Sequence, residues 1–320
     1  MRIFVDDGST NIKLGWSDNG EIKTLISANS FIQEWSWNLG DSAPANYEID
    51  GERFSYNPTS PDAVRTTETR YQYSDVNVIA IHHALLQSGI APQPIDIVVT
   101  LPLVEYLDTD NQPNKVNIER KKQNVRRAVQ VQGGESFTIR KVSVLPESVP
   151  AGFNILKDLD ALDSLLIIDL GGTTLDISHV RSKMSGITKT WCDSKIGVSM
   201  ITESVKNALD VNASTRVSSL AADDLIINRR QVDYLTKRIP DAQHRAQVLS
   251  VMKEREKTLK HRVIDTVNRF SGYTHVMCVG GGADIVADAV QQATKVPVDR
   301  FYRSDDPQFD LVLGMIAMKG

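Results

Sequence analysis

Residues 165–176 read LLIIDLGGTTLD, and this stretch decides the fold. Its first four residues are aliphatic, and a run that apolar is typical of a strand buried on both faces of a sheet. Asp169 then lies near the strand's end, where α/β sheets bind their ligands. Apolar and polar residues alternate after the turn, which predicts that the chain doubles back as an antiparallel strand.

The turn within this stretch has the chemistry of a phosphate-binding loop. Gly171 and Gly172 carry no Cβ, so their backbone N–H groups can come close to an oxyanion. Thr173 and Thr174 add hydroxyl donors. The turn is not a Walker loop, because that motif needs a Gly-Lys-Ser/Thr ending that opens a helix. Alone the turn is weak evidence, since glycines often follow strands.

A second copy of the plan lies near the N-terminus, where residues 3–14 read IFVDDGSTNIKL. An apolar strand again meets an acid, a glycine and hydroxyl residues, and an alternating strand follows. The residues of this loop are Asp6, Asp7, Gly8, Ser9, Thr10 and Asn11. Two similar halves that each offer a β-turn to one ligand predict a duplicated α/β architecture with a cleft between the halves.

Length and charge limit the classes of function. A chain of 320 residues exceeds a typical single domain, so two domains are expected. The net charge of −4 gives no general attraction to nucleic acid or to anionic lipid. No apolar run approaches the roughly 18 residues of a membrane span, and no signal peptide precedes the first strand. Cys192 and Cys278 are expected to be reduced core thiols, which favours a cytoplasmic location.

The remaining pattern alternates strands with helices. One helix, at residues 114–129, carries a basic run, and we expect it to present a solvated face; contact with an acidic partner or another subunit is the alternative. Its basic residues are Arg120, Lys121, Lys122, Arg126 and Arg127. Further strands are expected at 2–5, 11–17, 21–26, 95–100, 137–145 and 275–279, and further helices at 76–88, 151–158, 200–209, 241–270, 285–293 and 310–318.

Three other positions are candidates for a site. Glu147 follows a strand and precedes a helix, so it either stabilises the helix dipole or acts in catalysis. Gly197 precedes a helix, where backbone can reach a ribose or phosphate, although a plain turn also explains it. The triple glycine Gly280, Gly281 and Gly282 would let a flat ring lie on the backbone. As a third loop at a strand end it favours a nucleoside.

In chain order these motifs resemble the actin, DnaK-type chaperone and sugar kinase superfamily. Within it the chain is most similar to the ParM (StbA) family of actin-like plasmid segregation ATPases. The likeness lies in residues 5–14, 73–78, 146–148, 164–176 and 270–277. The resemblance implies an α/β, actin-like fold, in which two ribonuclease-H-like domains flank a nucleotide cleft. Domain I would comprise residues 1–157 plus 303–320, and domain II residues 158–302.

The resemblance also implies roles for the loop residues. Mg-ATP would occupy the cleft, with GTP left open as an alternative. Asp6 and Asp169 would hold Mg²⁺ through its waters, with Asp7 as the alternative to Asp6. Glu147 would orient the attacking water with help from Asp169. The phosphates would contact Gly8, Ser9, Thr10, Gly171, Gly172 and Thr173, with Asp7, Asn11, Thr174 and Gly197 as further nucleotide contacts, and the glycines at 280–282 would flank the adenosine.

The function implied is an ATPase that polymerises under nucleotide control. Subunits would stack head-to-tail, since a contact that does not close on itself makes a filament. Hydrolysis would loosen the polymer. A centromere-binding adaptor of the ParR kind would link the filament to plasmid DNA, so the chain would meet DNA only indirectly, and no membrane is involved. The alternative is a small-molecule kinase, for a sugar or an acid, from the same superfamily.

Overall fold

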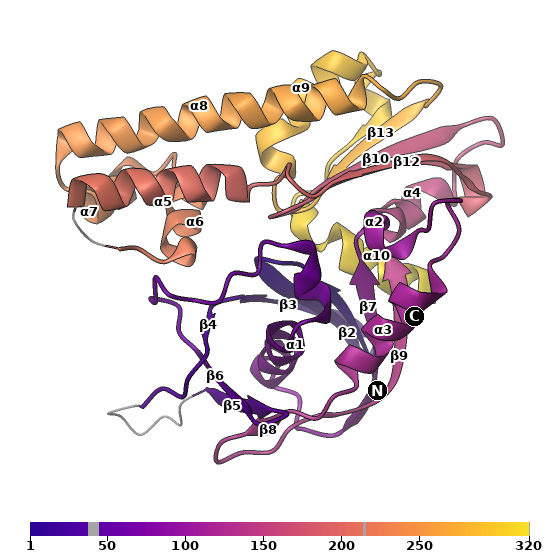
Figure 1. Cartoon of the computed structure of the whole chain (residues 1–320). Coiled ribbons are helices and arrows are strands. Elements are labelled where there is room, and N and C mark those ends of the chain that lie inside the picture. The colour runs from indigo at the N-terminus through magenta and orange to yellow at the C-terminus, as the bar shows by residue number, and fades with distance from the viewer. Residues whose placement is uncertain (38–44, 214–215, 320) are drawn as a thin grey trace.

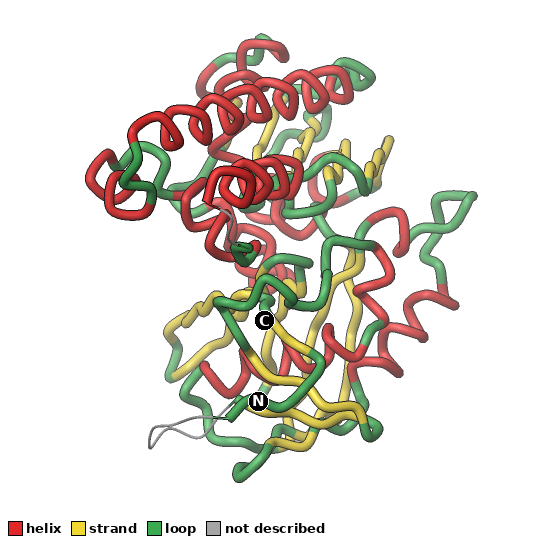
Figure 2. The backbone as a smooth tube through the Cα atoms, turned by 60° about the vertical axis from the view of Figure 1, so that its left-hand side comes forward, coloured by secondary structure: helices red, strands yellow, loops and turns green. Residues whose placement is uncertain are grey.

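The computed structural model describes residues 1–37, 45–213 and 216–319. Gly320, the last residue of predicted domain I, lies outside them. Figure 2 shows two halves, one above the other, joined near the middle. Each half is built on a five-stranded mixed sheet.

The first sheet has the strand order β3-β2-β1-β7-β9 (Figure 1). Strand β1 pairs antiparallel with β2 on one side and parallel with β7 on the other. A right-handed crossover is the usual connection between parallel neighbours, and α1 lies in it here. The strands are β1 (Arg2–Asp7), β2 (Asn11–Asp18), β3 (Glu21–Ala28), β7 (Pro94–Leu101) and β9 (Thr138–Pro146).

The second sheet repeats this plan in the order β12-β11-β10-β13-β14. Strand β10 pairs antiparallel with β11 and parallel with β13, as β1 does with β2 and β7. The predicted duplication and the actin-like α/β fold class are therefore confirmed. The strands are β10 (Ser164–Leu170), β11 (Leu175–Arg181), β12 (Ile187–Asp193), β13 (His275–Val279) and β14 (Phe301–Tyr302).

Strand β10 is buried along its whole length, as its apolar run predicts. Leu166 and Ile168 face a core shared with the long helices of the second half. Leu165 and Ile167 face the opposite way, toward the segment that links the two halves. Because successive side chains of a strand point to opposite faces, only a continuous apolar run can serve both cores.

Helices cover both sheets. The first half has α1 (Asp75–Gln87), α2 (Leu103–Tyr106), α3 (Lys115–Val125) and α4 (Phe153–Leu156). The second half has α5 (Ser199–Ala213), α6 (Ser219–Ile227), α7 (Val232–Arg238), α8 (Ala242–Val267) and α9 (Ala283–Thr294). Helix α10 (Asp310–Lys319) comes after them in the chain but packs on the first sheet. A small sheet joins β4 (Phe31–Ile32), β5 (Asn46–Ile49), β6 (Glu52–Tyr56) and β8 (Gln130–Val131). Short 3-10 turns occupy η1 (Thr69–Tyr73), η2 (Val149–Gly152), η3 (Ser182–Met184), η4 (Val298–Arg300) and η5 (Pro307–Phe309).

Two predicted helices are shorter than expected. Helix α3 ends at Val125 because the chain turns there to let Gln130 pair with Glu48 of β5. Only residues 153–156 of the predicted helix at 151–158 are α-helical, since residues 149–152 form a 3-10 turn with Pro150 as its second residue. Within the described ranges, no helix is both long and apolar enough to cross a membrane.

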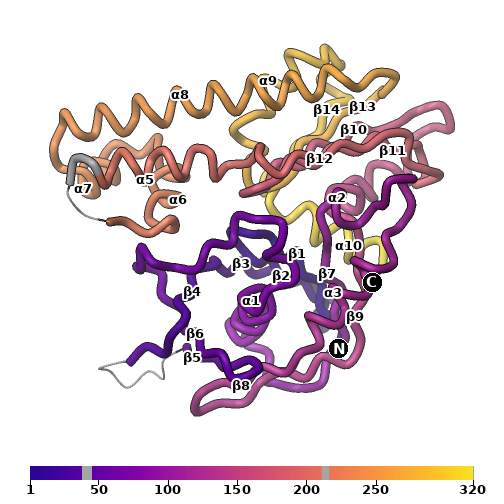
Figure 3. Tube along the Cα trace, in the orientation of Figure 1, coloured from indigo at the N-terminus to yellow at the C-terminus, as the bar shows by residue number. Residues whose placement is uncertain are grey.

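Helix α10 returns from the end of the chain to the first sheet (Figure 3). It packs Val312, Met315 and Ile316 against Phe4 and Val98, on the face of the sheet away from α1. A Cβ at Gly15 of β2 would lie 2.8 Å from Ile316 Cδ1, so a larger residue there would displace the Ile316 side chain, and glycine allows the close approach. The division of the chain at 157/158 and 302/303 stays a prediction.

Candidate functional site

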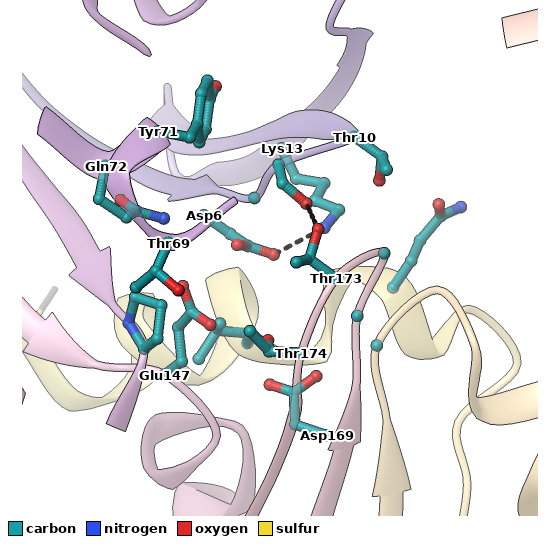
Figure 4. A pocket seen from close by; sticks show the side chains of 18 of the residues that line it. Asp6, Thr10, Lys13, Thr69, Tyr71, Gln72, Glu147, Asp169, Thr173 and Thr174 are labelled. Atoms are coloured by element: carbon teal, nitrogen blue, oxygen red, sulfur yellow. Dashed lines mark hydrogen bonds and ion pairs between the residues drawn. The ribbon is translucent and has the colours of Figure 1, made fainter. Parts of the chain in front are cut away.

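Both predicted turns line one cleft between the halves. The cleft between them is narrow, with a cavity volume of about 50 Å³. Figure 4 shows side chains of the two turns pointing toward one another. From the first turn and strand come Asp6, Gly8, Ser9 and Thr10, and from the second Asp169, Gly171, Gly172, Thr173 and Thr174.

The turns also touch. The Ser9 Oγ and Thr173 Oγ1 atoms lie 2.5 Å apart, which is hydrogen-bond distance. A Cβ at Gly172 would lie 2.4 Å from Thr10 Cγ2, so the second turn needs glycine to approach the first. The Gly171 N–H donates to the carbonyl oxygen of Thr174 at 2.9 Å and closes the second turn. The crevice is therefore shared, with hydroxyls and backbone N–H groups on both walls.

Asp6 forms an ion pair inside the cleft with Lys13, the residue opposite it in the first hairpin. The Lys13 Nζ lies 2.9 Å from Asp6 Oδ2, and the two side chains are 11% and 9% exposed. Burial alone would lower the pKa of Lys13, but the carboxylates of Asp6, Asp169 and Glu147 together raise it. Sequence reasoning missed Lys13, although its place opposite Asp6 follows once the hairpin register is known.

Carboxyl groups crowd the floor of the cleft. Burial, followed by the charges of Asp6 and Asp176, raises the pKa of Asp169 to about 8, while Lys13 opposes the shift. Burial, followed by Asp176, Asp6 and Asp169, raises the pKa of Glu147 well above its usual value. Lys13 therefore balances only part of the negative charge. A cation bound here would lower both pKa values again.

This set of residues fits magnesium but not a metal held by protein alone. Among the described residues, no three His, Cys, Asp or Glu side chains are grouped to hold a metal ion. Magnesium takes one or two carboxylates and completes its shell with waters and phosphate oxygens. Asp6 and Asp169 line the same cleft and offer that number of carboxylates.

Asp7 does not face the cleft, which separates it from Asp6. Its Oδ1 accepts hydrogen bonds from the N–H of Thr100 at 3.1 Å and from the Thr100 hydroxyl at 3.3 Å. Its Oδ2 accepts from Asn77 Nδ2 at 2.9 Å and from Lys121 Nζ. Neighbouring residues of a strand point to opposite faces, so only one of the two acids can reach the cleft. The geometry favours Asp6 as the metal candidate.

The solvated face predicted for the basic helix is wrong at Lys121. Its side chain is fully buried and pairs with Asp7. The Nζ also donates to the Gln72 carbonyl at 3.0 Å and to Asn77 Oδ1 at 2.9 Å. Burial lowers the pKa of Lys121, and the Asp7 carboxylate opposes that shift. This network anchors the back of the first turn, since Gln72 in turn lines the cleft.

A second cavity continues from the cleft around Thr10, Gly172 and Gly280. The predicted positions Asn11 and Gly281 line it, and its wall combines apolar side chains with the charged side chains of Asp223, Arg229, Asp284, Asp305 and Asp306. The apolar lining consists of Val198, Ile226, Ile227, Ile285 and Pro307. Sequence reasoning missed this wall, because α6 carries no motif. A cavity that is apolar on one wall and polar on the other, beside a phosphate-sized cleft, suits a flat polar ring joined to phosphates.

Gly197 and Gly282 line neither cavity, unlike the other predicted glycines. A Cβ at Gly197 would lie 2.4 Å from the carbonyl oxygen of Gly172. A Cβ at Gly282 would lie 2.6 Å from Leu170 Cγ. Gly197 therefore lets the backbone of the second turn pack against it, and Gly282 leaves room for the Leu170 side chain, so both shape the site without lining it.

Comparison with known proteins agrees with this architecture. The family model described as "Plasmid segregation protein ParM, N-terminal" matches residues 1–158, and "Plasmid segregation protein ParM, C-terminal" matches residues 159–318. A comparison with curated proteins finds no match.

Solved structures share the fold at low identity. A 15-stranded ParM filament from Clostridium botulinum is 15% identical, with a TM-score of 0.72 over 99% of this chain and 98% of that one. The archaeal actin homolog Ta0583 in complex with ADP is 18% identical, with a TM-score of 0.70 over 100% of both chains. The filament structure of AlfA from B. subtilis plasmid pLS32 is 12% identical, with a TM-score of 0.57 over 100% and 99%. The two family models together cover nearly the whole sequence, and the chain belongs to the ParM family of actin-like plasmid segregation proteins.

Proposed function

We propose that this chain is a cytoplasmic, magnesium-dependent ATPase whose head-to-tail filaments segregate plasmid DNA. The observation that carries the proposal is the meeting of two equivalent turns on one cleft lined with excess carboxyl groups. Membership of the ParM family favours this function over a small-molecule kinase of the same fold.

The cleft residues divide the work of hydrolysis. Backbone N–H groups and hydroxyls of the two turns hold the phosphates from both sides, and Lys13 adds a positive charge among them. Asp6 and Asp169 hold Mg²⁺, which when bound neutralises charge on the phosphates. Glu147 orients the attacking water at the floor. Phosphoryl transfer needs little more than positioning and charge neutralisation, so these groups suffice.

The apolar second cavity takes the base. Val198, Ile226 and Ile285 offer flat apolar contact, and Gly281 leaves room for a ring against the backbone. Support for a nucleotide also comes from the archaeal actin homolog, which was solved with ADP. The proposal takes ATP as the substrate, and GTP stays the alternative.

Support for self-assembly comes from the similar proteins that were solved as filaments. Both the Clostridium botulinum ParM and AlfA were solved as filaments. A repeated contact between unlike faces that does not close into a ring produces such a polymer. An adaptor of the ParR kind would join the filament end to the plasmid centromere, because a net charge of −4 gives the chain no general affinity for DNA.

Polymerisation is tested by pelleting. With Mg-ATP at tens of micromolar protein, we expect most of the chain to sediment, and with ADP or without magnesium we expect it to stay in the supernatant. Ninety-degree light scattering should rise and then fall as ATP is consumed. A protein that stays monomeric under every nucleotide condition contradicts the filament proposal.

Hydrolysis is tested at Glu147. Replacing Glu147 by alanine should slow ATP turnover by roughly 10²-fold, the usual scale for a positioned base, while ATP affinity is kept. Glu68→Ala is a matched control, because that glutamate lines the same cleft but pairs with Arg70. Phosphate release and nucleotide binding are measured on both variants. Normal turnover in Glu147→Ala would remove this residue from the mechanism.

A further inference from the structure

The backbone bends sharply immediately after Glu147. Ser148 has φ 69° and ψ −61°, in the positive-φ region that residues with a Cβ rarely adopt. The N–H of Val149 donates to the Glu147 carbonyl at 2.8 Å, which closes a three-residue γ-turn around Ser148. A γ-turn of this hand is rare and strained. Such strain persists only where the surroundings hold it, and it gathers at functional sites.

The surroundings hold Ser148 from the opposite half of the molecule. Its side chain is fully buried, and its Oγ lies 2.6 Å from the Oγ of Ser178, which is also fully buried. Ser178 lies in the middle of β11, where it faces Ile167 of β10 in the ladder. The hydroxyl bond therefore joins the end of the first sheet's β9 to the centre of the second sheet.

The same residue also contacts the reacting end of the cleft. The backbone N–H of Ser148 lies near the Asp169 carboxylate and opposes the rise in the pKa of that group. Glu147 is fixed on its other side by its own N–H, which donates to the Leu101 carbonyl at 2.8 Å. Ser148 therefore lies close to both carboxyl groups assigned to hydrolysis, those of Glu147 and Asp169, and is bonded to Ser178 on the second half.

We propose that Ser148 is a positioning residue for ATP hydrolysis. Its strained turn directs the Glu147 side chain into the cleft. Its hydrogen bond to Ser178 makes the direction of Glu147 depend on the position of one half relative to the other. The inference rests on the proposed ATPase function. When the halves close on nucleotide, Ser178 and Asp169 move together on one sheet and hold Ser148 between them. Glu147 then points at the cleft only in the closed arrangement, so hydrolysis is delayed until closure.

The test removes the bond from each end. Ser148→Ala and Ser178→Ala should each lower kcat for ATP about tenfold, the effect expected for one buried hydrogen bond in the transition state, while KM changes less than about twofold. The double variant should lose no more than either single variant, since all three lack the same bond. Ser178→Thr keeps a hydroxyl and suits a strand, so it should retain most of the turnover.

Two further variants separate strain from anchoring and from general loss of a hydroxyl. Ser148→Gly relieves the strain as well as losing the anchor, so its kcat should fall at least as far as that of Ser148→Ala. Ser55→Ala is the control, because Ser55 is a fully buried serine in the small sheet whose hydroxyl has no partner among the described residues. Its turnover should equal that of the wild type.

The outcomes distinguish this inference from the function on which it rests. A wild type that does not hydrolyse ATP overturns both. If the wild type hydrolyses ATP and both Ser148→Ala and Ser178→Ala keep the kcat of the wild type, only the role of Ser148 is overturned. A change confined to KM, or losses that add in the double variant, also overturns it, since either would indicate two separate structural effects. If Ser148→Ala does not fold, Ser178→Ala removes the same bond without altering the turn and decides the question.

Discussion

Replacing Asp169 by alanine should lower magnesium-dependent ATP turnover by roughly 10³-fold, the scale of losing a principal electrostatic group of an active site. Asp169 lies near the end of β10 and lines the cleft beside the second turn. It is the one carboxylate assigned both to the metal and to the water. Without it, the dependence of turnover on magnesium concentration should weaken as well.

The measurement is steady-state phosphate release across a magnesium titration, with thermal melting as the control for folding. The nucleotide-free variant should melt no lower than the wild type, because burial, followed by the charges of Asp6 and Asp176, raises the pKa of Asp169 to about 8. Loss of activity together with a kept or raised melting temperature identifies a functional group that costs stability. Normal activity with unchanged magnesium dependence would contradict the metal role.

Replacing Lys121 by methionine should destabilise the protein by about 3–5 kcal/mol, the usual cost of breaking a buried ion pair from one side. The Asp7 carboxylate would keep its bonds to Asn77 and Thr100 but would lose its only buried cation among the described residues. Denaturant unfolding measures the change. Since Asp7 adjoins the first turn, nucleotide affinity should fall as well.

Two comparisons make the Lys121 result specific. Lys122→Met is the control, because the neighbouring lysine is 30% exposed and its one ion pair within the described ranges is with a half-exposed glutamate, so its effect should stay within about 0.5 kcal/mol. Adding Asp7→Asn to Lys121→Met removes the uncompensated charge and should recover part of the lost stability. Equal unfolding midpoints for the two lysine variants would show that the buried Lys121–Asp7 ion pair does not make this contribution to the free energy of unfolding.

The parts of the fold that the sequence predicts are those that depend on residues close together in the chain. The apolar run of β10 predicts burial on both faces, and the repeated turn with its glycines predicts two equivalent hairpins. The two turns line one cleft, so Gly8 and Gly171 lie at the same site although they belong to separate halves. The two hairpins can be predicted because their paired strands are close in sequence and because glycine and other turn residues mark the turn between them.

What could not be predicted depends on partners far along the chain. Period-two alternation predicts that Asp6 and Asp7 face opposite ways, and the spacing of the second loop favours Asp6 over Asp7 for the cleft. The partner that holds Asp7 on the other face, the buried Lys121, could not be predicted. Lys121 itself sits in a basic run that is indistinguishable from a solvated face until the helix is docked. The positive φ of Ser148 leaves no mark at all, since serine is an ordinary residue before a turn.

The return of α10 to the first sheet has a consequence for synthesis on the ribosome. The face formed by Phe4, Val98 and Leu145 stays open until residues 310–319 have been made, because α10 supplies its cover. At about 5–20 residues per second, the N-terminal half waits many seconds with an uncovered apolar surface while the C-terminal half is translated. Nascent chains are therefore exposed to chaperones during that interval, and a shortened C-terminus would harm the half that was made first.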